Sequence, residues 1–381
     1  ARTRGLGLVT MRLEDGDEQE CKHVMFPSKQ FYDRNKISYT IHLNSTLICK
    51  TENGNQAETE DYIAGSKVLG MIAGAMGQTA YREMMSKENM VVSNAYIKCG
   101  QTRCIPGRAS WQTEKDQSYD ADGKMMIFDL LYEPDCGSRQ MTYSGIDYIA
   151  DDKKVMTVDT EISYHHQRPE DKSIGRATGN EDGSSFYQLA GISEGQSFGG
   201  FIYAGREVAE KIIEAVGTLK HVRMGYGKSG EFGDVDFTLD SLEEVCDKNP
   251  QDTVKDAVIT VLSDLVLYNK QGILTAEPEV LKQYLEDILS VSDLEIRNPF
   301  FKFDTVGGFN VTWKRRKPVF YAIGKGSSFI LHSECGFDIQ LLKNCFIGER
   351  TTEGYGEIIA EKFLRGKSAS EGKIYISKYS D

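Results

Sequence analysis

The sequence of 381 residues has no apolar run that approaches the length of a membrane-spanning helix, and it has no signal-peptide pattern. It also lacks Cys-x2-Cys pairs, and its eight cysteines are mostly scattered along the chain. In a large chain without an export signal, such cysteines are typical of reduced thiols. We therefore predict a globular protein of the cytoplasm that has no membrane partner.

An excess of positive charge is missing as well. The formal net charge is −12, from 45 Lys and Arg against 57 Asp and Glu. This balance counts against sequence-independent binding of nucleic acid over the whole surface, but it leaves room for a local basic groove. The densest basic run, Lys-Arg-Arg-Lys at residues 314–317, is either a solvated loop or part of such a groove.

Glycine-rich loops are the most distinctive feature that is present. They occur at residues 348–356 and 225–233, with a further relative at residues 1–9. Each combines basic residues with a small-residue turn and a following β-type run. Glycine permits positive φ and close approach of another backbone, and exposed N–H groups beside an Arg suit a phosphate chain. Three such loops indicate a repeated supersecondary unit.

The pattern of the chain predicts an α+β protein built from two units of similar order. We place the first unit at residues 36–240 and the second at 253–381, separated by an acidic stretch with Pro250. Residues 14–35 are a linker, and residues 1–13 are the tail of an upstream unit, so that the chain is a fragment or one piece of a longer fusion. In each unit, a strand and a helix precede further strands, a short helix, a glycine loop and a last strand.

Several local features complete this prediction. Residues 97–150 show few regular signals and are expected to form a long loop. Residues 186–189 and 198–203 are expected to pair as a hairpin, and residues 207–216 and 278–291 to form amphipathic helices. Residues after 360 are expected to form a polar tail.

Three segments carry a resemblance to a known family. Residues 348–356, Gly-Glu-Arg-Thr-Thr-Glu-Gly-Tyr-Gly, are similar to the C-terminal Gly-Glu-Arg-Arg-x-Glu-Gly-Phe-Gly loop of the RAMP superfamily, the RNA-binding subunits of CRISPR effector complexes. Residues 61–66, Asp-Tyr-Ile-Ala-Gly-Ser, resemble the family's turn before the first helix, with Ala64 where Pro is usual. Residues 92–96, Val-Ser-Asn-Ala-Tyr, resemble its Phe-Ser-Asn-Ala-Tyr-Pro segment.

Over residues 37–360 the order of these motifs most resembles the double-RAMP subunit of type III-D effector complexes, in the group that binds the 5′ handle of the guide RNA. The resemblance implies two tandem ferredoxin-like (RRM-like) domains with long inserted loops. It also implies a structural subunit that grips guide RNA (crRNA) in an antiviral ribonucleoprotein and meets target RNA indirectly. The implied protein partners are a polymerase-like large subunit, backbone RAMP subunits and a small helical subunit.

Two other functions are also compatible with the sequence. One is an endoribonuclease that matures guide RNA or cleaves target RNA, and the other is an acidic α+β protein with a metabolite site. RNA binding itself requires no cofactor. No catalytic residue is assigned, because no aspartate or histidine stands out from the rest.

The candidate RNA contacts are the glycines, hydroxyls, aromatic and basic residues of the loops and of the polar segment at 164–185, namely Gly65, Ser66, Lys67, His165, His166, Arg168, Arg176, Gly225, Gly227, Lys228, Ser229, Gly230, Gly348, Arg350, Gly354, Tyr355 and Gly356. Arg350 and Lys228 are the expected phosphate contacts. The alternative for each loop is a tight turn that serves packing alone. The turn at 65–67 either caps a helix or holds a phosphate at a helix N-terminus.

Two further groups suggest chemistry. His165 and His166 offer a general base that an Arg can complement in RNA cleavage, or they belong to a solvated loop that grips the guide. Cys99, Cys104 and Cys136 offer three zinc ligands, or they are buried free thiols.

Overall fold

The computed structural model describes residues 34–50, 58–77, 79–82, 90–132, 136–167, 185–217, 219–245, 252–310, 314–363 and 373–378. The predicted upstream tail at 1–13 lies outside these residues, and so does the predicted linker except for its last two residues. Those two residues begin the first strand of the fold.

The first unit is organised around the alternating strand β1 (Arg34–Leu43). Its odd-numbered side chains from Ile37 to Leu43 are buried, whereas its even-numbered side chains face the opposite side of the sheet. The strands are ordered β14-β15-β1-β13-β3-β4, and β2 also pairs with β13. The other elements are β2 (Val91–Val92), β3 (Tyr96–Cys99), β4 (Thr102–Arg103), β13 (Ser197–Ala204), β14 (His221–Arg223), β15 (Asp234–Val245), α1 (Gly65–Met76) and α3 (Arg206–Val216).

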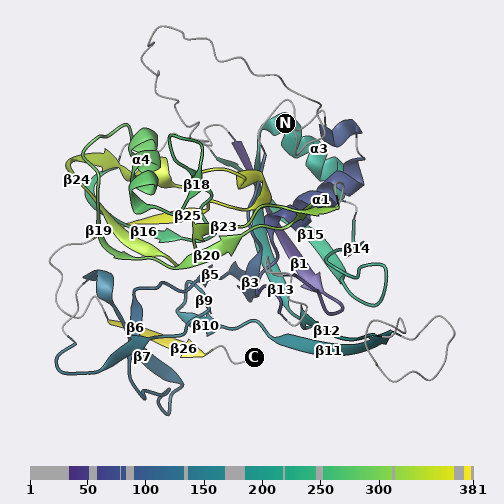
Figure 1. Cartoon of the computed structure of the whole chain (residues 1–381), viewed down its shortest axis with the longest axis horizontal. Helices are drawn as coiled ribbons and strands as arrows, with labels where there is room; N and C mark the ends of the chain where they lie inside the picture. Colours follow the sequence, from purple (N-terminus) through teal and green to yellow (C-terminus); the bar gives the residue numbers. More distant parts are fainter. Residues whose placement is uncertain are drawn as a thin grey trace, which may run out of the picture.

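Both helices of this unit cover the same face of its sheet (Figure 1). Val208, Ile212 and Val216 recur every fourth residue of α3, which gives that helix one apolar stripe. These side chains share a buried core with Val68 and Ile72 of α1 and with the odd-numbered residues of β1. The even-numbered face of β1 is therefore left open toward the rest of the molecule.

The second unit also has its first strand in the interior of its sheet, but its second helical element is the short 3-10 helix η3 rather than an α-helix. Its strands are ordered β19-β24-β16-β25, and α4 packs on the sheet through a buried stripe that includes Leu281, Leu285 and Ile288. The predicted helix at 278–291 is confirmed, and it ends at Leu289, since Ser290 takes a left-handed conformation. The elements are β16 (Thr253–Val261), α4 (Pro278–Leu289), β19 (Glu295–Phe300), β24 (Ser328–Asp338), η3 (Ile339–Leu342), η4 (Thr351–Glu353) and β25 (Ile358–Lys362).

A third sheet occupies the region that the sequence predicts to be a long loop. Its strands are β5 (Ile105–Pro106), β6 (Trp111–Glu114), β7 (Lys124–Asp129), β8 (Met141–Tyr143), β9 (Tyr148–Ile149), β10 (Lys154–Met156) and β26 (Lys373–Lys378). The predicted polar tail is also wrong in part, because β26 pairs antiparallel with β7 and parallel with β10. These strands are two to six residues long, and β26 comes from a distant part of the chain, so local periodicity does not reveal them.

A two-stranded arm leaves the first unit at its lower edge in Figure 1. It consists of β11 (Thr160–Gln167) and β12 (Ser185–Ile192), which pair with each other. The predicted hairpin of residues 186–189 with 198–203 is therefore wrong, because β13 pairs with β1 and β3 instead. His165 and His166 lie in a strand rather than in a polar loop.

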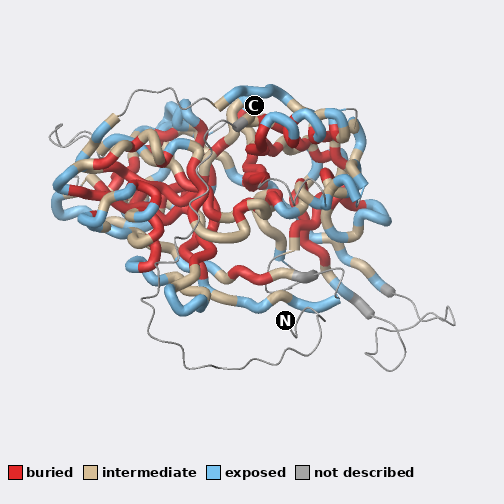
Figure 2. The backbone as a smooth tube through the Cα atoms, turned by 90° about the horizontal axis from the view of Figure 1, so that it is seen from above, coloured by how far each residue is buried: buried red, intermediate tan, exposed pale blue. Residues whose placement is uncertain are grey.

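Buried residues form separate cores in the two units, with a smaller one under the third sheet (Figure 2). The predicted α+β class is confirmed by this sheet-rich arrangement, in which the helices α1, α3 and α4 pack on the sheets. Within those ranges, no helix has the length and apolar character needed to cross a membrane.

Candidate nucleic-acid interface

The glycine loop at 348–356 lies against the start of α1 in the other unit. A Cβ placed on Gly65 would come within 2.9 Å of the Cα of Gly354. Gly354 has a φ of 101°, and a Cβ there would overlap the Oδ1 of Asn94. That oxygen accepts a hydrogen bond from the N–H of Gly65 at 2.9 Å. The three segments that resemble the RAMP family therefore meet at one junction between the two units.

Arg350 is engaged within its own loop. Its Nη2 donates to Oε2 of Glu353 at 2.7 Å, and Nζ of Lys317 donates to the same oxygen at 3.0 Å. The Arg350 guanidinium also lies 4.6 Å from the ring centre of Tyr355. Burial acts to raise the pKa of Glu353, but the two cations outweigh it and hold that pKa below its ordinary value. The cation of this loop is thus neutralised by an internal carboxylate.

The backbone of the same loop is tied to the second unit. The N–H of Gly356 donates to the carbonyl of Asp264 at 3.0 Å, and the N–H of Glu349 donates to that of Val266 at 2.8 Å. Gly348 packs closely against Val266 as well. The loop at 348–356 therefore connects the start of α1 in the first unit with the backbone of the second unit.

The turn before α1 is only partly open. Because the N–H of Gly65 is bonded to Asn94 and its Cα faces Gly354, the first turn of the helix is covered on that side. Ser66 is exposed and Lys67 is half-buried. The structure thus separates the buried backbone of this turn from the two side chains that remain near solvent.

The other glycine loop, at 225–233, connects β14 to β15 and has a different setting. Gly233 has a φ of 75°, and a Cβ there would overlap the carbonyl of Met224, so only glycine fits this close turn. The loop is anchored by Phe232, which packs with Ile48 and Leu189. Nη1 of Arg223 donates to the carbonyl of Gly230 across the loop. These contacts fix the loop while leaving its tip uncovered.

The tip of the loop at 225–233, which is the first of the two glycine loops in chain order, is exposed and basic. Lys228, Ser229 and Gly230 are exposed, and the ring of Tyr226 is 49% exposed. Nζ of Lys50 lies 3.3 Å above that ring. No carboxylate of the described chain forms an ion pair with Lys50, Arg223 or Lys228. An aromatic face flanked by unpaired cations is a suitable surface for a nucleic-acid strand.

The arm brings one histidine to this loop. The ring of His165 stacks on Tyr187 at 5.3 Å and meets the edge of Phe232 at 5.6 Å. Its Nε2 lies 3.0 Å from Oγ of Ser163. His166, the next residue of the strand, projects to the opposite face and is exposed. The two histidines therefore cannot act on one substrate atom, and the predicted Arg168 and Arg176 lie outside the described residues.

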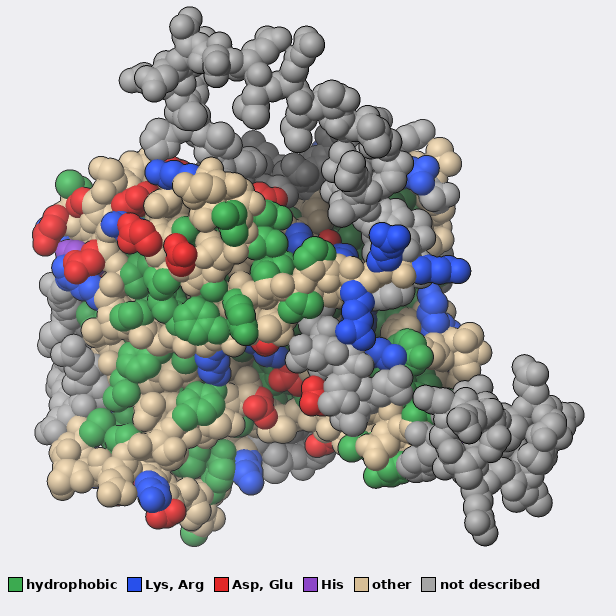
Figure 3. Space-filling model, viewed as in Figure 1, with side chains coloured by type: hydrophobic (Ala, Val, Ile, Leu, Met, Phe, Trp, Pro, Cys, Tyr) green, Lys and Arg blue, Asp and Glu red, His purple; other side chains and the backbone are tan. Residues whose placement is uncertain are grey.

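A basic hairpin stands beside the second glycine loop. Lys314, Arg315 and Arg316 are exposed, and the neighbouring Lys317 binds Glu353 of that loop. The hairpin pairs β21 (Phe309–Asn310) with β22 (Arg315–Arg316), next to the pair β20 (Phe303–Val306) and β23 (Phe320–Ile323). Figure 3 shows Lys and Arg side chains gathered on one side of this view, away from the acidic side chains at its upper left.

Two groups of basic residues beside the glycine loops are not among the contacts that the sequence predicts. The run at 314–316 is visible as a charge cluster, but nothing local links it to the glycine loop. Lys50 and Arg223 have no such signal, because Lys50 reaches Tyr226 only through the bridge between Ile48 and Tyr226. The pairing of distant backbone segments is what brings Lys50 to the loop at 225–233.

The three candidate zinc ligands are not brought together. Cys99 and Cys104 are buried close to one another in and after β3, and burial raises the pKa of Cys99 and raises that of Cys104 to about 12. Cys136 is half-buried elsewhere. In the part of the chain that the structure describes, no three His, Cys, Asp or Glu side chains are grouped as metal ligands.

Comparison with known proteins gives structural similarity only. No protein-family model and no curated protein sequence matches the chain. A chain of the type III-B Cmr-beta complex bound to cognate target RNA is 13% identical, with a TM-score of 0.39 over 81% of this chain and 89% of that one. A RAMP protein that binds different RNA substrates is 10% identical, with a TM-score of 0.34 over 87% and 100%.

A CRISPR protein from Archaeoglobus fulgidus is a further similar structure. It is 11% identical, with a TM-score of 0.29 over 78% of this chain and 91% of that one. All three TM-scores are below 0.5, so the similarity concerns the fold alone.

Proposed function

We propose that the chain is a guide-RNA-binding structural subunit of a type III CRISPR effector complex. In this proposal, the glycine loop at 225–233 binds the 5′ handle of the guide RNA. The observation that carries the RNA contact is the exposed tip of that loop, where Tyr226 and the unpaired cations Lys50 and Lys228 lie together. The link to CRISPR complexes comes from the order of the sequence motifs at residues 61–66, 92–96 and 348–356.

In this proposal, the two glycine loops have different roles. The loop at 225–233 contacts RNA, since no described carboxylate neutralises its cations. The loop at 348–356 braces the two units, since Glu353 neutralises Arg350 and Gly354 packs on Gly65. The exposed cations at 314–316, beside the brace, give the strand a second place to bind.

The fold that supports this role is a tandem of two ferredoxin-like domains. Each unit runs strand, helix, strand, strand, helix or short helix, strand, with the first strand in the interior of its sheet. The resemblance adds the expected neighbours, which are a polymerase-like large subunit, backbone RAMP subunits and a small helical subunit. The net charge of the chain is −12, so acidic surface, which does not suit RNA, is available for such protein contacts.

A ribonuclease is the less favoured function. General acid–base cleavage needs two groups that reach the same phosphodiester. His165 and His166 project to opposite faces of β11, and no described carboxylate is bonded to either ring. We therefore expect RNA to be bound without turnover.

The test is RNA binding by a loop variant with matched charge controls. In Lys50→Ala/Lys228→Ala, two cations near the strand are removed. We expect weaker binding of repeat-derived RNA, with the slope of log K against log salt reduced by about 1.4, because each phosphate contact on a single strand contributes roughly 0.7. Fluorescence anisotropy over a series of salt concentrations measures both quantities.

The control is Lys211→Ala/Lys255→Ala, which removes the same charge from cations that already pair with Glu207 and Glu334. It should leave the salt slope unchanged. Equal losses in the two double variants would show that net charge, rather than the loop, governs binding. RNA that co-purifies with the complex should share a repeat-derived 5′ end, and its absence at low salt would exclude the proposed role.

A further inference from the structure

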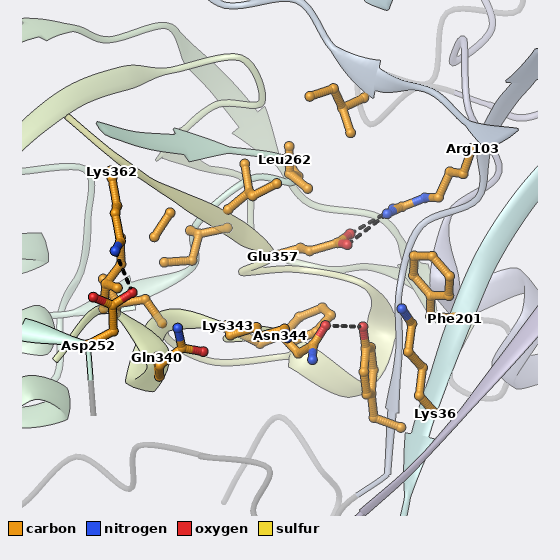
Figure 4. Close-up of a pocket in the computed structure, with 18 residues that line it drawn as sticks. Lys36, Arg103, Phe201, Asp252, Leu262, Gln340, Lys343, Asn344, Glu357 and Lys362 are labelled. Carbon is orange, nitrogen blue, oxygen red and sulfur yellow. Dashed lines mark hydrogen bonds and ion pairs between the residues drawn. The ribbon is translucent and has the colours of Figure 1, made fainter. Parts of the chain in front are cut away.

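A pocket of about 550 Å³ lies between the open face of the first sheet and the second unit. One wall carries Lys36 of β1 and Phe201 of β13, and the facing wall carries Lys343 and Asn344 after η3. Figure 4 shows Lys36 beside Phe201, with Glu357 directed at Arg103 above them and the Asp252–Lys362 pair at the far end. The volume is within the range of ~300–1,000 Å³ that small-molecule sites occupy.

Arg103 provides this pocket with an unused donor. Its Nη1 and Nη2 bind the two oxygens of Glu357 at 2.8 and 2.7 Å, and Nη2 also donates to the carbonyl of Asn94 at 2.9 Å. The side chain is only 8% exposed, and its buried Nε has no hydrogen-bond partner. Buried polar groups are nearly always hydrogen-bonded, so this N–H is an unsatisfied donor of a residue that lines the pocket.

The pocket holds more positive charge than its carboxylates balance. Glu357 is already bound by Arg103, and Asp252 is bound by Lys362 at 2.7 Å. Lys36 forms no ion pair with any described carboxylate. Burial lowers the pKa of Lys36, and Arg103 and Lys343 add to this effect, whereas Glu243 and Glu357 oppose it. An anion bound here would relieve that repulsion.

Aromatic side chains form a row along the same pocket. The rings of Phe201 and Tyr203 are 6.3 Å apart, and those of Tyr203 and Phe346 are 5.6 Å apart. Nζ of Lys36 lies 4.0 Å from the ring centre of Phe201. The hydroxyl of Tyr203 donates to Oδ1 of Asn344 at 3.2 Å, which leaves the amide nitrogen of Asn344 as a donor at the pocket.

We propose that this pocket binds a single nucleotide. Its phosphate lies against Lys36, and its base lies against Phe201, which is the partly exposed ring of the aromatic row, whereas Tyr203 and Phe346 are buried behind it. Cations beside aromatic faces are the combination that recognises nucleotides, whereas an acidic peptide would use the cations alone. The nucleotide is either one residue of a bound RNA strand or a free mononucleotide, because both present the same phosphate and base.

The site is separate from the proposed RNA contact of the first glycine loop. Lys36 is near one end of β1, and the chain approaches that loop beyond Leu43 at the other end, roughly 23 Å away along the strand. The inference extends the proposed function to a second position, and it can hold or fail without the loop.

Binding of 5′-AMP, inorganic phosphate and a short single-stranded RNA can be measured by isothermal titration calorimetry on the full chain. Lys36→Met keeps an aliphatic stem over Phe201 but removes the charge, and Lys211→Ala on α3 is the control. We expect Lys36→Met to weaken 5′-AMP roughly ten-fold or more, since it removes a charge-assisted contact. Lys343→Ala should give a smaller loss because Lys343 is exposed.

The probes distinguish the two sources. Saturable 5′-AMP binding that Lys36→Met weakens supports a free nucleotide, and loss of affinity for RNA alone supports a residue of the strand. Equal behaviour of Lys36→Met and Lys211→Ala with both probes would overturn the proposal. Phosphate binding as tight as 5′-AMP, or displacement of 5′-AMP by an acidic peptide, would overturn the role of the aromatic row.

The loop variant Lys50→Ala/Lys228→Ala separates this inference from the proposed function. If it binds RNA normally while Lys36→Met loses 5′-AMP, the loop assignment is wrong and the pocket stands. If it loses RNA while Lys36→Met binds every probe normally, the pocket is wrong and the loop stands.

Discussion

Gly354→Ala tests the brace between the two units most directly. Gly354 has a φ of 101°, and an added Cβ would overlap Oδ1 of Asn94 and lie 3.0 Å from the nitrogen of Gly65. Asn94 would have to move, which breaks its hydrogen bond to the buried N–H of Gly65. The substitution therefore combines backbone strain with the loss of one buried contact.

The expected cost follows from these two parts. Positive φ costs a non-glycine residue about 1–2 kcal/mol. A buried N–H left without its acceptor costs a further ~1–3 kcal/mol. We expect the free energy of unfolding to fall by about 2–5 kcal/mol, which is a large share of the ~5–15 kcal/mol that stabilises a typical domain. Urea denaturation followed by far-ultraviolet circular dichroism measures this change.

Two other glycines separate the parts of this cost. Gly272 has a φ of 73° and no atom within 4 Å of the position that an alanine methyl would take, so Gly272→Ala reports the backbone strain alone. Gly230 has no positive φ and only an ordinary contact at 3.5 Å, so Gly230→Ala should change stability by less than ~0.5 kcal/mol. If Gly354→Ala costs no more than Gly272→Ala, the close contact between the loop and α1 does not exist, and the brace is refuted.

Three further predictions concern other parts of the fold. Burial raises the pKa of Glu60 from 4.5 to about 7. Its contribution to the free energy of unfolding is therefore present below pH ~4.5 and is lost as the pH rises toward about 7. Glu60→Gln should flatten this pH dependence of stability in urea titrations. Arg108→Met should cost about 3–5 kcal/mol, because it leaves the buried Asp129 without its cation, and adding Asp129→Asn should recover part of the loss. Ile376→Ala should cost about 2–5 kcal/mol in thermal or urea unfolding, while Tyr375→Ala, at a neighbouring exposed position, should cost far less.

Elements with strong local signals could be predicted from the sequence. The alternation of Ile37, Tyr39 and Ile41 identifies β1, and the apolar stripes of residues 207–216 and 278–291 identify two helices. The third sheet could not be predicted in this way, because its strands are two to six residues long and one of them comes from residues 373–378. A period of two is not recognisable over so few residues.

The candidate site, like the fold, could be predicted from the sequence only in part. The glycine loops and their order are visible in the sequence, but the loops look alike there and only tertiary contacts set them apart. One signal for the second loop is available, since Glu353 follows Arg350 by three residues and a turn can bring such a pair together. No comparable signal indicates that Lys36, Arg103 and Asn344 line one pocket, because they come from three distant segments.

The late arrival of β26 has a consequence for the synthesis of the chain. Its partners β7 and β10 end by Met156, more than two hundred residues before Lys373. At translation rates of about 5–20 residues per second, those strands wait roughly 10–40 s for the strand that pairs with both of them. During that interval, the edges of β7 and β10 are open to other chains, so a nascent-chain chaperone or an early partner subunit has its greatest effect there.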